Sequence, residues 1–298
     1  MKKKILPILL VTVLLITCLS GAVLAGAEKS SQETQWQISV LQYGVCKVAN
    51  FSVLLPNSTV KEQVEFPFLG FLLKSGNRYV LVDTGVDEAF GKLAWSCKEG
   101  SLALVKKALK DNGVTPDMIE MVIYTHLHYD HAGGCQLFPK AVHVFQKSEW
   151  EGLLDPLPIQ LSRSDYDPNQ VNKMRDLKTL MVDGDAEILP GINVYEAGGH
   201  SVGGQLITVE TAAGMKVLAG DVGLFWCAVF PDQVTSLTDL NGLKVAANPN
   251  LKYDRLGITN SLITDYFEWY DSSQLLHILA QNKWQNVYPG HEPGLLKK

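Results

Sequence analysis

The sequence predicts an α/β fold, and three observations support this prediction. Strand-like and helix-like segments alternate over residues 66–154, three strand-like runs follow one another between residues 192 and 219, and a helix and a strand come last. The 298-residue chain is 46% apolar, so it can fill a large core, and no linker-like stretch divides it. We therefore expect a single domain, over residues 26–298.

The first predicted elements are two strands joined by a turn. Residues 67–73 and 78–83 are dominated by apolar side chains, and the Gly and Asn of residues 74–77 favour a turn between them. Residues 101–112 carry apolar side chains at helical spacing and end before a glycine, which predicts a helix. The apolar run at residues 121–124 predicts the next strand.

The middle of the chain continues this alternation. Residues 141–146 predict a strand, and residues 148–154 predict a helix that begins at Ser148, a residue type favoured at helix N-termini. Residues 155–185 are polar and irregular, so no element is predicted there.

The last part of the chain contains more strands than helices. Glycine-bearing turns separate three predicted strands, over residues 192–197, 205–210 and 215–219. The aromatic and Asn/Gly-rich residues 222–260 allow no assignment. Beyond them we expect an amphipathic helix over residues 272–281 and a final strand over residues 286–288.

The N-terminus has the pattern of an export signal. Three lysines precede an uncharged apolar stretch over residues 5–25, and Val23-Leu24-Ala25 offers small residues for cleavage. We expect residues 1–25 to be removed and the mature chain to begin at Gly26. An uncleaved membrane anchor and a lipid attached to Cys18 are the alternatives, and all three place the domain outside the cytoplasm.

Charge and cysteine content exclude some classes of protein. The formal net charge is −5 and no stripe of Lys and Arg is present, so no nucleic-acid partner is expected. The cysteines beyond the leader are too sparse and too irregularly spaced for a disulfide framework or a zinc knuckle, and we expect buried free thiols at Cys46, Cys97, Cys135 and Cys227.

Residues 125–134 carry the strongest chemical signal. Directly after the apolar run at residues 121–124, the segment His-x-His-x-Asp-His presents four side chains that can bind a divalent metal ion, namely His126, His128, Asp130 and His131. A histidine-rich surface loop is the alternative. Three of the seven histidines of the chain fall within these six residues and glycines follow at once, which favours a metal site.

Three further candidate ligands lie in the second half. His200, Asp221 and His291 each follow a glycine at the end of an apolar run, where a residue without Cβ lets the chain turn sharply into a shared cleft. Together with the first segment they make seven candidate ligands. This number is sufficient for two metal ions.

This pattern resembles the metallo-β-lactamase superfamily and, within it, the N-acyl homoserine lactonases. The resemblance covers nearly the whole mature chain and rests on five segments in the family's order, at residues 81–85, 125–134, 197–201, 219–221 and 288–291. It implies an αββα sandwich, in which helices flank two mixed β-sheets that pack face to face.

The resemblance also implies a role for each candidate ligand. It assigns the first metal to His126, His128 and His200, the second metal to Asp130, His131 and His291, and the bridging position to Asp221. Asp83 would accept the free ring N–H of a ligand histidine. Alternatively, Asp83 only closes a turn with Gly85.

The implied mechanism uses two divalent ions, zinc or else Mn, Fe or Co. The pair would lower the pKa of a shared water and polarise the carbonyl of a small ester or lactone. Asp130 would be the catalytic residue that carries a proton to the leaving alkoxide. The lactonases have a tyrosine three residues after the bridging aspartate, but this chain has Leu224, and Tyr129 is a candidate replacement in the substrate pocket.

Several other functions use a similar site. A thioester hydrolase of the glyoxalase II type, or a phosphodiesterase, should bring basic residues near the metals, and no such cluster is visible. The bridging Asp221 disfavours a β-lactamase, and the complete ligand set disfavours an exported protein that binds metals without turnover. His143 and His277 lie outside the pattern, and we expect structural roles for them.

Overall fold

A computed structural model describes residues 35–56, 58–94, 96–247 and 262–297. All of them belong to the larger of two compact units, residues 33–298. The predicted export signal and the predicted domain boundary at residue 26 lie outside the described residues. Among the helices that the structure describes, none has the length and apolar character to cross a membrane.

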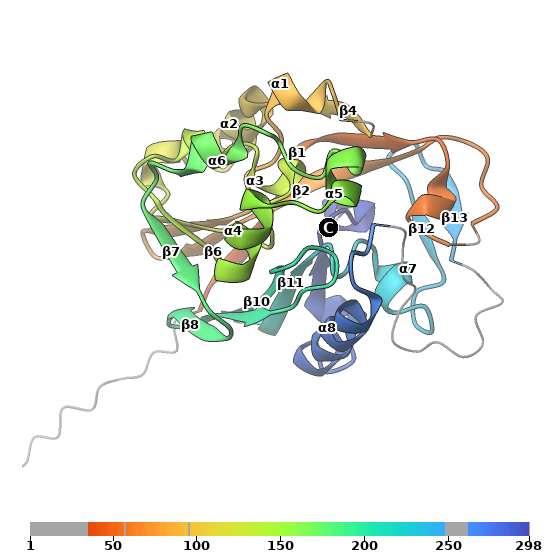
Figure 1. Cartoon of the computed structure of the whole chain (residues 1–298). Helices are drawn as coiled ribbons and strands as arrows, with labels where there is room; N and C mark the ends of the chain where they lie inside the picture. Colours follow the sequence, from red (N-terminus) through yellow and green to blue (C-terminus); the bar gives the residue numbers. More distant parts are fainter. Residues whose placement is uncertain (1–34, 57, 95, 248–261, 298) are drawn as a thin grey trace, which may run out of the picture. The chain divides into compact units, whose positions relative to one another are not determined.

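The first sheet has seven strands in the order β4-β1-β2-β3-β5-β6-β7 (Figure 1). The pairs on the β4 side of β3 are antiparallel, and the pairs from β3 to β7 are parallel, so the sheet is mixed. Its strands are β1 (Gln37–Val48), β2 (Val64–Ser75), β3 (Arg78–Val82), β4 (Cys97–Gly100), β5 (Met121–Ile123), β6 (Val142–Gln146) and β7 (Thr179–Val182).

The second sheet has five strands in the order β14-β11-β10-β9-β8 and is also mixed, because β14 pairs parallel to β11 while the other pairs are antiparallel. Its strands are β8 (Ala186–Leu189), β9 (Ile192–Glu196), β10 (Gln205–Thr211), β11 (Gly214–Gly220) and β14 (Val287–Pro289). A separate hairpin consists of β12 (Ser236–Thr238) and β13 (Lys244–Ala246).

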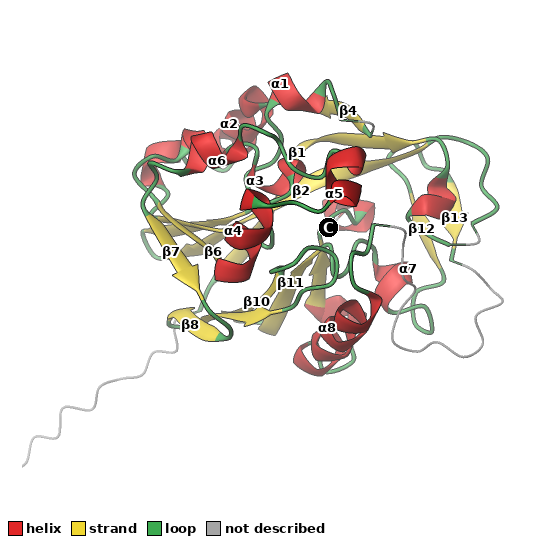
Figure 2. Cartoon of the chain, viewed as in Figure 1, coloured by secondary structure: helices red, strands yellow, loops and turns green. Residues whose placement is uncertain are grey.

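Helices cover the outer faces of both sheets (Figure 2). Helix α2 contacts β1 and α4 contacts β6 of the first sheet, whereas α8 contacts β11 of the second. The helices are α1 (Glu88–Gly91), α2 (Leu102–Asp111), α3 (Tyr129–Ala132), α4 (Lys147–Leu154), α5 (Pro158–Arg163), α6 (Gln170–Met174), α7 (Trp226–Val229) and α8 (Tyr266–Leu279).

Strand β2 is buried on both faces and shows how the layers pack. Phe66 and Phe68 belong to a cluster that includes residues of α2, while Leu69 and Phe71 face a second cluster shared with the other sheet. Burial on both faces explains why this strand is apolar almost without interruption. Two mixed sheets face to face with helices outside confirm the predicted αββα sandwich.

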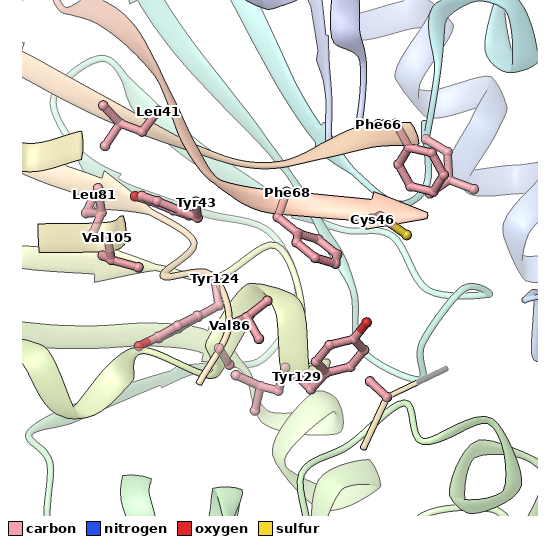
Figure 3. Close-up of a cluster of buried hydrophobic side chains, with 14 of the residues drawn as sticks. Leu41, Tyr43, Cys46, Phe66, Phe68, Leu81, Val86, Val105, Tyr124 and Tyr129 are labelled. Carbon is pink, nitrogen blue, oxygen red and sulfur yellow. The ribbon is translucent and has the colours of Figure 1, made fainter. Parts of the chain in front are cut away.

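One end of the first cluster carries aromatic and polar side chains together. Figure 3 shows Phe66, Phe68, Cys46 and Tyr129 at this end, away from Leu81 and Val105. The rings of Phe68 and Tyr129 lie 6.3 Å apart in an edge-on arrangement. The core therefore extends to the loop of the predicted metal site.

The structure corrects the prediction for residues 155–185. Instead of an irregular segment, they contain α5, α6 and β7. The helices are only six and five residues long, and three of the four side chains of β7 are exposed. Short elements with so few buried side chains leave no clear periodicity in the sequence.

Helix boundaries also differ from the prediction. Helix α4 begins at Lys147, and the hydroxyl of Ser148 donates to Glu196 at 2.6 Å instead of capping the helix. Helix α8 begins at Tyr266, six residues before the predicted start, because the carboxylate of Asp265 accepts the N–H groups of Phe267 and Glu268.

Some elements had no prediction. The 12-residue strand β1 pairs with β2 along nearly its whole length. Within residues 222–260 the structure shows α7, β12 and β13, and residues 248–261 lie outside the described part of the chain.

Candidate metal centre

The seven predicted ligands all follow the carboxyl ends of strands. Strands β9, β11 and β14 run in one direction within the second sheet, and β3 and β5 are parallel in the first. Their carboxyl ends meet at one edge of the sandwich. They lead to the loop and short helix of residues 126–131 after β5, and to His200, Asp221 and His291.

Two glycines before ligands are required by close approach. Gly220 has φ +48°, and a Cβ there would lie 2.6 Å from the Cβ of Thr125. Gly199 has φ +104°, and a Cβ would lie 2.2 Å from the backbone nitrogen of Trp269. The sharp turns expected at these positions are present in the structure.

The ligand atoms fall into three overlapping groups, each within 4.8 Å. The groups are His126, His128 and His200; His126, His131 and Asp221; and Asp130, His131 and His291. The structure thus brings all seven predicted residues together. The first and last groups are the same sets of three residues that the family resemblance assigned to the first and second metals. Their roles as metal ligands stay predictions.

Asp221 lies between the two groups of predicted ligands. Its Oδ1 is 3.3 Å from Nε2 of His131 and 3.2 Å from Nε2 of His291, whereas its Oδ2 is 3.4 Å from Nε2 of His200. One carboxylate oxygen therefore faces each group of ligands. This orientation is what a bridging ligand requires.

Buried atoms at the site test whether a metal fits. Nε2 of His126, Nε2 of His131 and Oδ1 of Asp221 are buried and make no hydrogen bond. Each unsatisfied buried polar atom costs about 1–3 kcal/mol, and native proteins contain few of them. Imidazole nitrogen and carboxylate oxygen are zinc-binding atoms, so a divalent cation would satisfy all three. The residues fit the predicted metals.

The opposite ring nitrogens are held by the protein. Nδ1 of His131 lies 2.9 Å from Oδ2 of Asp83, and Nδ1 of His126 lies 3.1 Å from the hydroxyl of Thr125. Nδ1 of His291 lies 3.0 Å from the carbonyl of Pro67. These contacts direct Nε2 of each ring toward the other ligands.

Asp83 has the geometry of an orienting residue. It is 1% exposed and has φ +60°, and its carboxylate also accepts the N–H and the hydroxyl of Thr125, both at 2.8 Å. Of the two alternatives for Asp83, the contact with His131 favours orientation of the ring over turn closure alone. Thr125, which had no predicted role, connects Asp83 to His126.

Burial and neighbouring charges separate the histidines into two sets. Burial and nearby histidines hold the pKa values of His126 and His128 well below the ordinary value, and burial lowers the pKa of His200 to about 4. Burial is also the largest single influence on His131 and His291 and acts to lower their pKa values, but the nearby carboxylates of Asp221 and Asp130 together outweigh it and raise them. The first set is neutral near pH 7, as metal ligands must be.

A cavity of about 490 Å³, part of it open to solvent, lies beside the ligands. Both predicted pocket residues, Tyr129 and Leu224, line it. The hydroxyls of Tyr129 and Ser96 lie 3.2 Å apart on its wall, whereas Leu224 contributes an aliphatic side chain. Contact of these residues with a substrate stays a prediction.

The cavity also contains residues that sequence reasoning missed. Arg163 and Asp165 line it and form an ion pair, with Nη2 of the arginine 2.6 Å from Oδ2 of the aspartate. Burial raises the pKa of Asp165 to about 6, although Arg163 opposes this shift. The pair lies at and just after the end of α5, a helix too short to predict.

The remaining histidines agree with expectation, and so do the cysteines except Cys97, which is half-buried rather than buried. His143 contacts the hydroxyl of Tyr124 and the carbonyl of Phe138, and His277 contacts Asn282 and the carbonyl of Val229, so both are structural. The four described cysteines are free thiols, and Cys46 lies on the cavity wall.

Comparisons with known proteins agree with this geometry. The sequence pattern of the metallo-beta-lactamase superfamily matches residues 70–241. An N-acyl homoserine lactonase of Bacillus thuringiensis is 29% identical over 166 residues, which cover 52% of this chain and 63% of that protein. The match thus spans less than two thirds of the relative. A lactonase of a Bacillus species is 29% identical over 188 residues, 59% of this chain and 70% of the relative.

Solved structures share the fold. A quorum-quenching N-acyl homoserine lactone lactonase has a TM-score of 0.64 at 23% identity and covers 87% of this chain and 92% of its own. AidC, a dizinc quorum-quenching lactonase, has a TM-score of 0.65 at 17% identity and covers 88% and 89%. Since the family pattern matches more than half of the sequence and the architecture agrees, the chain belongs to the metallo-beta-lactamase superfamily.

Proposed function

We propose that this chain is a hydrolase that uses two divalent metal ions to open a lactone or a related ester. The observation that carries the proposal is Asp221, whose two oxygens face separate groups of ligand atoms. The names of the curated relatives, N-acyl homoserine lactonases, support a lactone as the substrate class.

The metals, when bound, would lower the pKa of water and polarise the carbonyl of the ester, so the protein needs no nucleophile of its own. Asp130 is placed to move the proton. Its carboxylate lines the cavity, is 12% exposed, and has Oδ2 3.6 Å from Nε2 of His291. It can therefore accept a proton from the attacking water and deliver it to the leaving alkoxide, which departs as the alcohol.

The charge of the cavity favours a neutral substrate. Arg163 is the one cationic side chain among the described residues that line the cavity. Asp165 pairs with it at 2.6 Å and cancels most of its charge. Beyond the proposed metal ions, the side chains of the cavity therefore offer little positive charge to the negative groups of a phosphodiester or a glutathione thioester. A lactone or simple ester carries none.

The test is a substrate screen of the purified protein after loading with Zn, Mn, Fe or Co. We expect turnover of lactones or carboxylic esters to exceed turnover of thioesters and phosphodiesters. Asp130→Asn, which keeps the size of the side chain but removes its basicity, should reduce that turnover about a hundredfold or more. Faster hydrolysis of thioesters or phosphodiesters would contradict the proposed substrate class.

We also propose that the protein is exported, on the basis of the three lysines, the apolar stretch and the small residues before Gly26. N-terminal sequencing of protein from the native host should begin at Gly26. A full-length product in the cytoplasm would contradict export. A membrane-bound product with a lipid on Cys18 would contradict only the cleavage site.

A further inference from the structure

We infer that Glu149 is a positioning residue that sets the spacing of the predicted ligands of the first metal. It lies in the first turn of α4 and is 0% exposed. Its Oε1 accepts the backbone N–H of Leu127 at 2.9 Å, and its Oε2 accepts the backbone N–H of Gly203 at 2.8 Å. One buried carboxylate thus joins two loops that are far apart in the sequence.

Both loops carry first-metal ligands. Leu127 lies between His126 and His128, and the second loop contains His200. Nε2 of His200 and Nδ1 of His128 are only 3.1 Å apart. The distance between these ligand atoms therefore depends on the distance between the loops that Glu149 joins.

Close packing leaves the second loop little room to move. A Cβ at Gly203 would lie 2.2 Å from the backbone nitrogen of Glu149, and a Cβ at Gly152 would lie 3.2 Å from the side chain of Val202. The loop is thus pressed against α4 at two points. A displacement of the carboxylate should therefore move both ligand loops, because the N–H groups of Leu127 and Gly203 bond to it directly.

Glu149 differs from Asp83 in how it acts. Asp83 contacts the ring of His131, a predicted ligand of the second metal. Glu149 accepts two backbone N–H groups and, at 3.4 Å, the hydroxyl of Tyr166, and it contacts no ligand ring directly, so its main effect is to place the loops. The inference rests on the two-metal site of the proposed function and is independent of the substrate.

The test is a Zn²⁺ titration of the metal-free full chain in competition with a chelating dye, with metal content checked by elemental analysis. Glu149→Gln preserves size but leaves one N–H facing an amide NH₂ group. We expect one of the two binding steps to weaken about tenfold or more. His291→Ala removes a predicted ligand of the second metal and should weaken the other binding step. This variant therefore identifies which step belongs to the second metal.

Asp239→Asn is the matched control. Asp239 is a buried carboxylate, 1% exposed, that accepts the N–H groups of Glu65, Asn241 and Leu243 and contacts neither ligand loop. The substitution Asp239→Asn should lower the free energy of unfolding without changing the affinity for either metal ion. The visible spectrum of the Co²⁺-loaded protein, which reports ligand arrangement, should change in Glu149→Gln and stay the same in Asp239→Asn.

Three results would overturn the inference. The first is a Glu149→Gln variant with unchanged metal affinities. The second is a Glu149→Gln variant that weakens the same binding step as His291→Ala. The third is an Asp239→Asn variant that loses as much metal affinity as Glu149→Gln. If Glu149→Gln does not fold, Glu149→Asp, which keeps the charge but is one methylene too short to span both N–H groups, must show the same selective loss. An unaltered chain that binds no metal would overturn the two-metal proposal and this inference together.

Discussion

At the scale of single residues, Leu224 is the position at which this chain departs from the pattern that the family resemblance implies. It lines the cavity and is 3% exposed, and its carbonyl accepts the N–H of His291 at 3.3 Å. The family resemblance leads us to expect a tyrosine hydroxyl at this position. The described wall offers instead the paired hydroxyls of Tyr129 and Ser96.

We predict that the unaltered protein opens acyl homoserine lactones slowly compared with some other lactone or ester. Leu224→Tyr should raise kcat for acyl homoserine lactones by up to about a hundredfold, because it adds a donor for the developing oxyanion. Leu224→Phe adds the ring without the hydroxyl and should give no gain. Efficient turnover by the unaltered protein, with no gain in Leu224→Tyr, would show that another residue supplies the contact.

Asp221 gives a second residue-scale prediction. Because its two oxygens face both groups of ligands, Asp221→Ala should lower the metal content from two ions per chain to one or fewer. Elemental analysis after reconstitution and gel filtration measures this directly. An unaltered chain that retains one ion or fewer, with no change in Asp221→Ala, would contradict a site for two metals.

At the scale of elements, helix α8 and the residues just before it support the loop of His200. The hydroxyl of Thr264 donates to the carbonyl of Gly199 at 2.8 Å, and the hydroxyl of Ser272 donates to the carbonyl of Gly198 at 2.9 Å. The start of the helix is set by the carboxylate of Asp265, which accepts two backbone N–H groups. The N-terminus of α8 and the loop that carries His200 are therefore joined by hydrogen bonds.

Asp265→Ala should reduce the free energy of unfolding by about 1 kcal/mol, because two helical N–H groups lose their acceptor. Asp265→Asn retains a capping oxygen and should stay close to the unaltered protein. Denaturant unfolding of the three proteins under identical metal conditions measures the difference. Equal stability of Asp265→Ala and the unaltered chain would mean that the cap contributes nothing to this helix.

At the scale of the whole molecule, the metals should contribute to stability as well as to chemistry. The predicted ligands come from both sheets, and metal-free they include buried atoms without hydrogen bonds. A ligand that binds only the folded state stabilises it by mass action, by about 4 kcal/mol at a thousandfold excess over Kd. Metal binding should therefore help to hold the two sheets together at this edge.

Removal of the metals with a chelator should consequently lower Tm, and readdition of Zn²⁺ should restore it. In Asp221→Ala the chelator should cause a smaller shift, because fewer ions are bound to begin with. Thermal unfolding followed by circular dichroism is sufficient for this measurement. Identical Tm values with and without metal would contradict a stabilising role.

The sequence by itself determined the α/β alternation, the mixed-sheet sandwich through its family resemblance, and the seven ligand candidates. These features are local: the His-x-His-x-Asp-His segment and the glycines before His200, Asp221 and His291 are visible within a few neighbouring residues. Apolar runs such as residues 67–73 are similarly local, because burial on both faces of a strand requires them.

Only the tertiary structure decided how these parts are arranged. Glu149, Arg163 and Thr125 gave no sequence signal, because each acquires its neighbours from segments far away along the chain. The packing of the two sheets likewise sets the orientation of Asp221. One of its carboxylate oxygens faces His200, and the other faces His131 and His291. A spacing in sequence specifies which side chains can bind a metal, whereas distances between loops are set by the packing of all the elements beneath them.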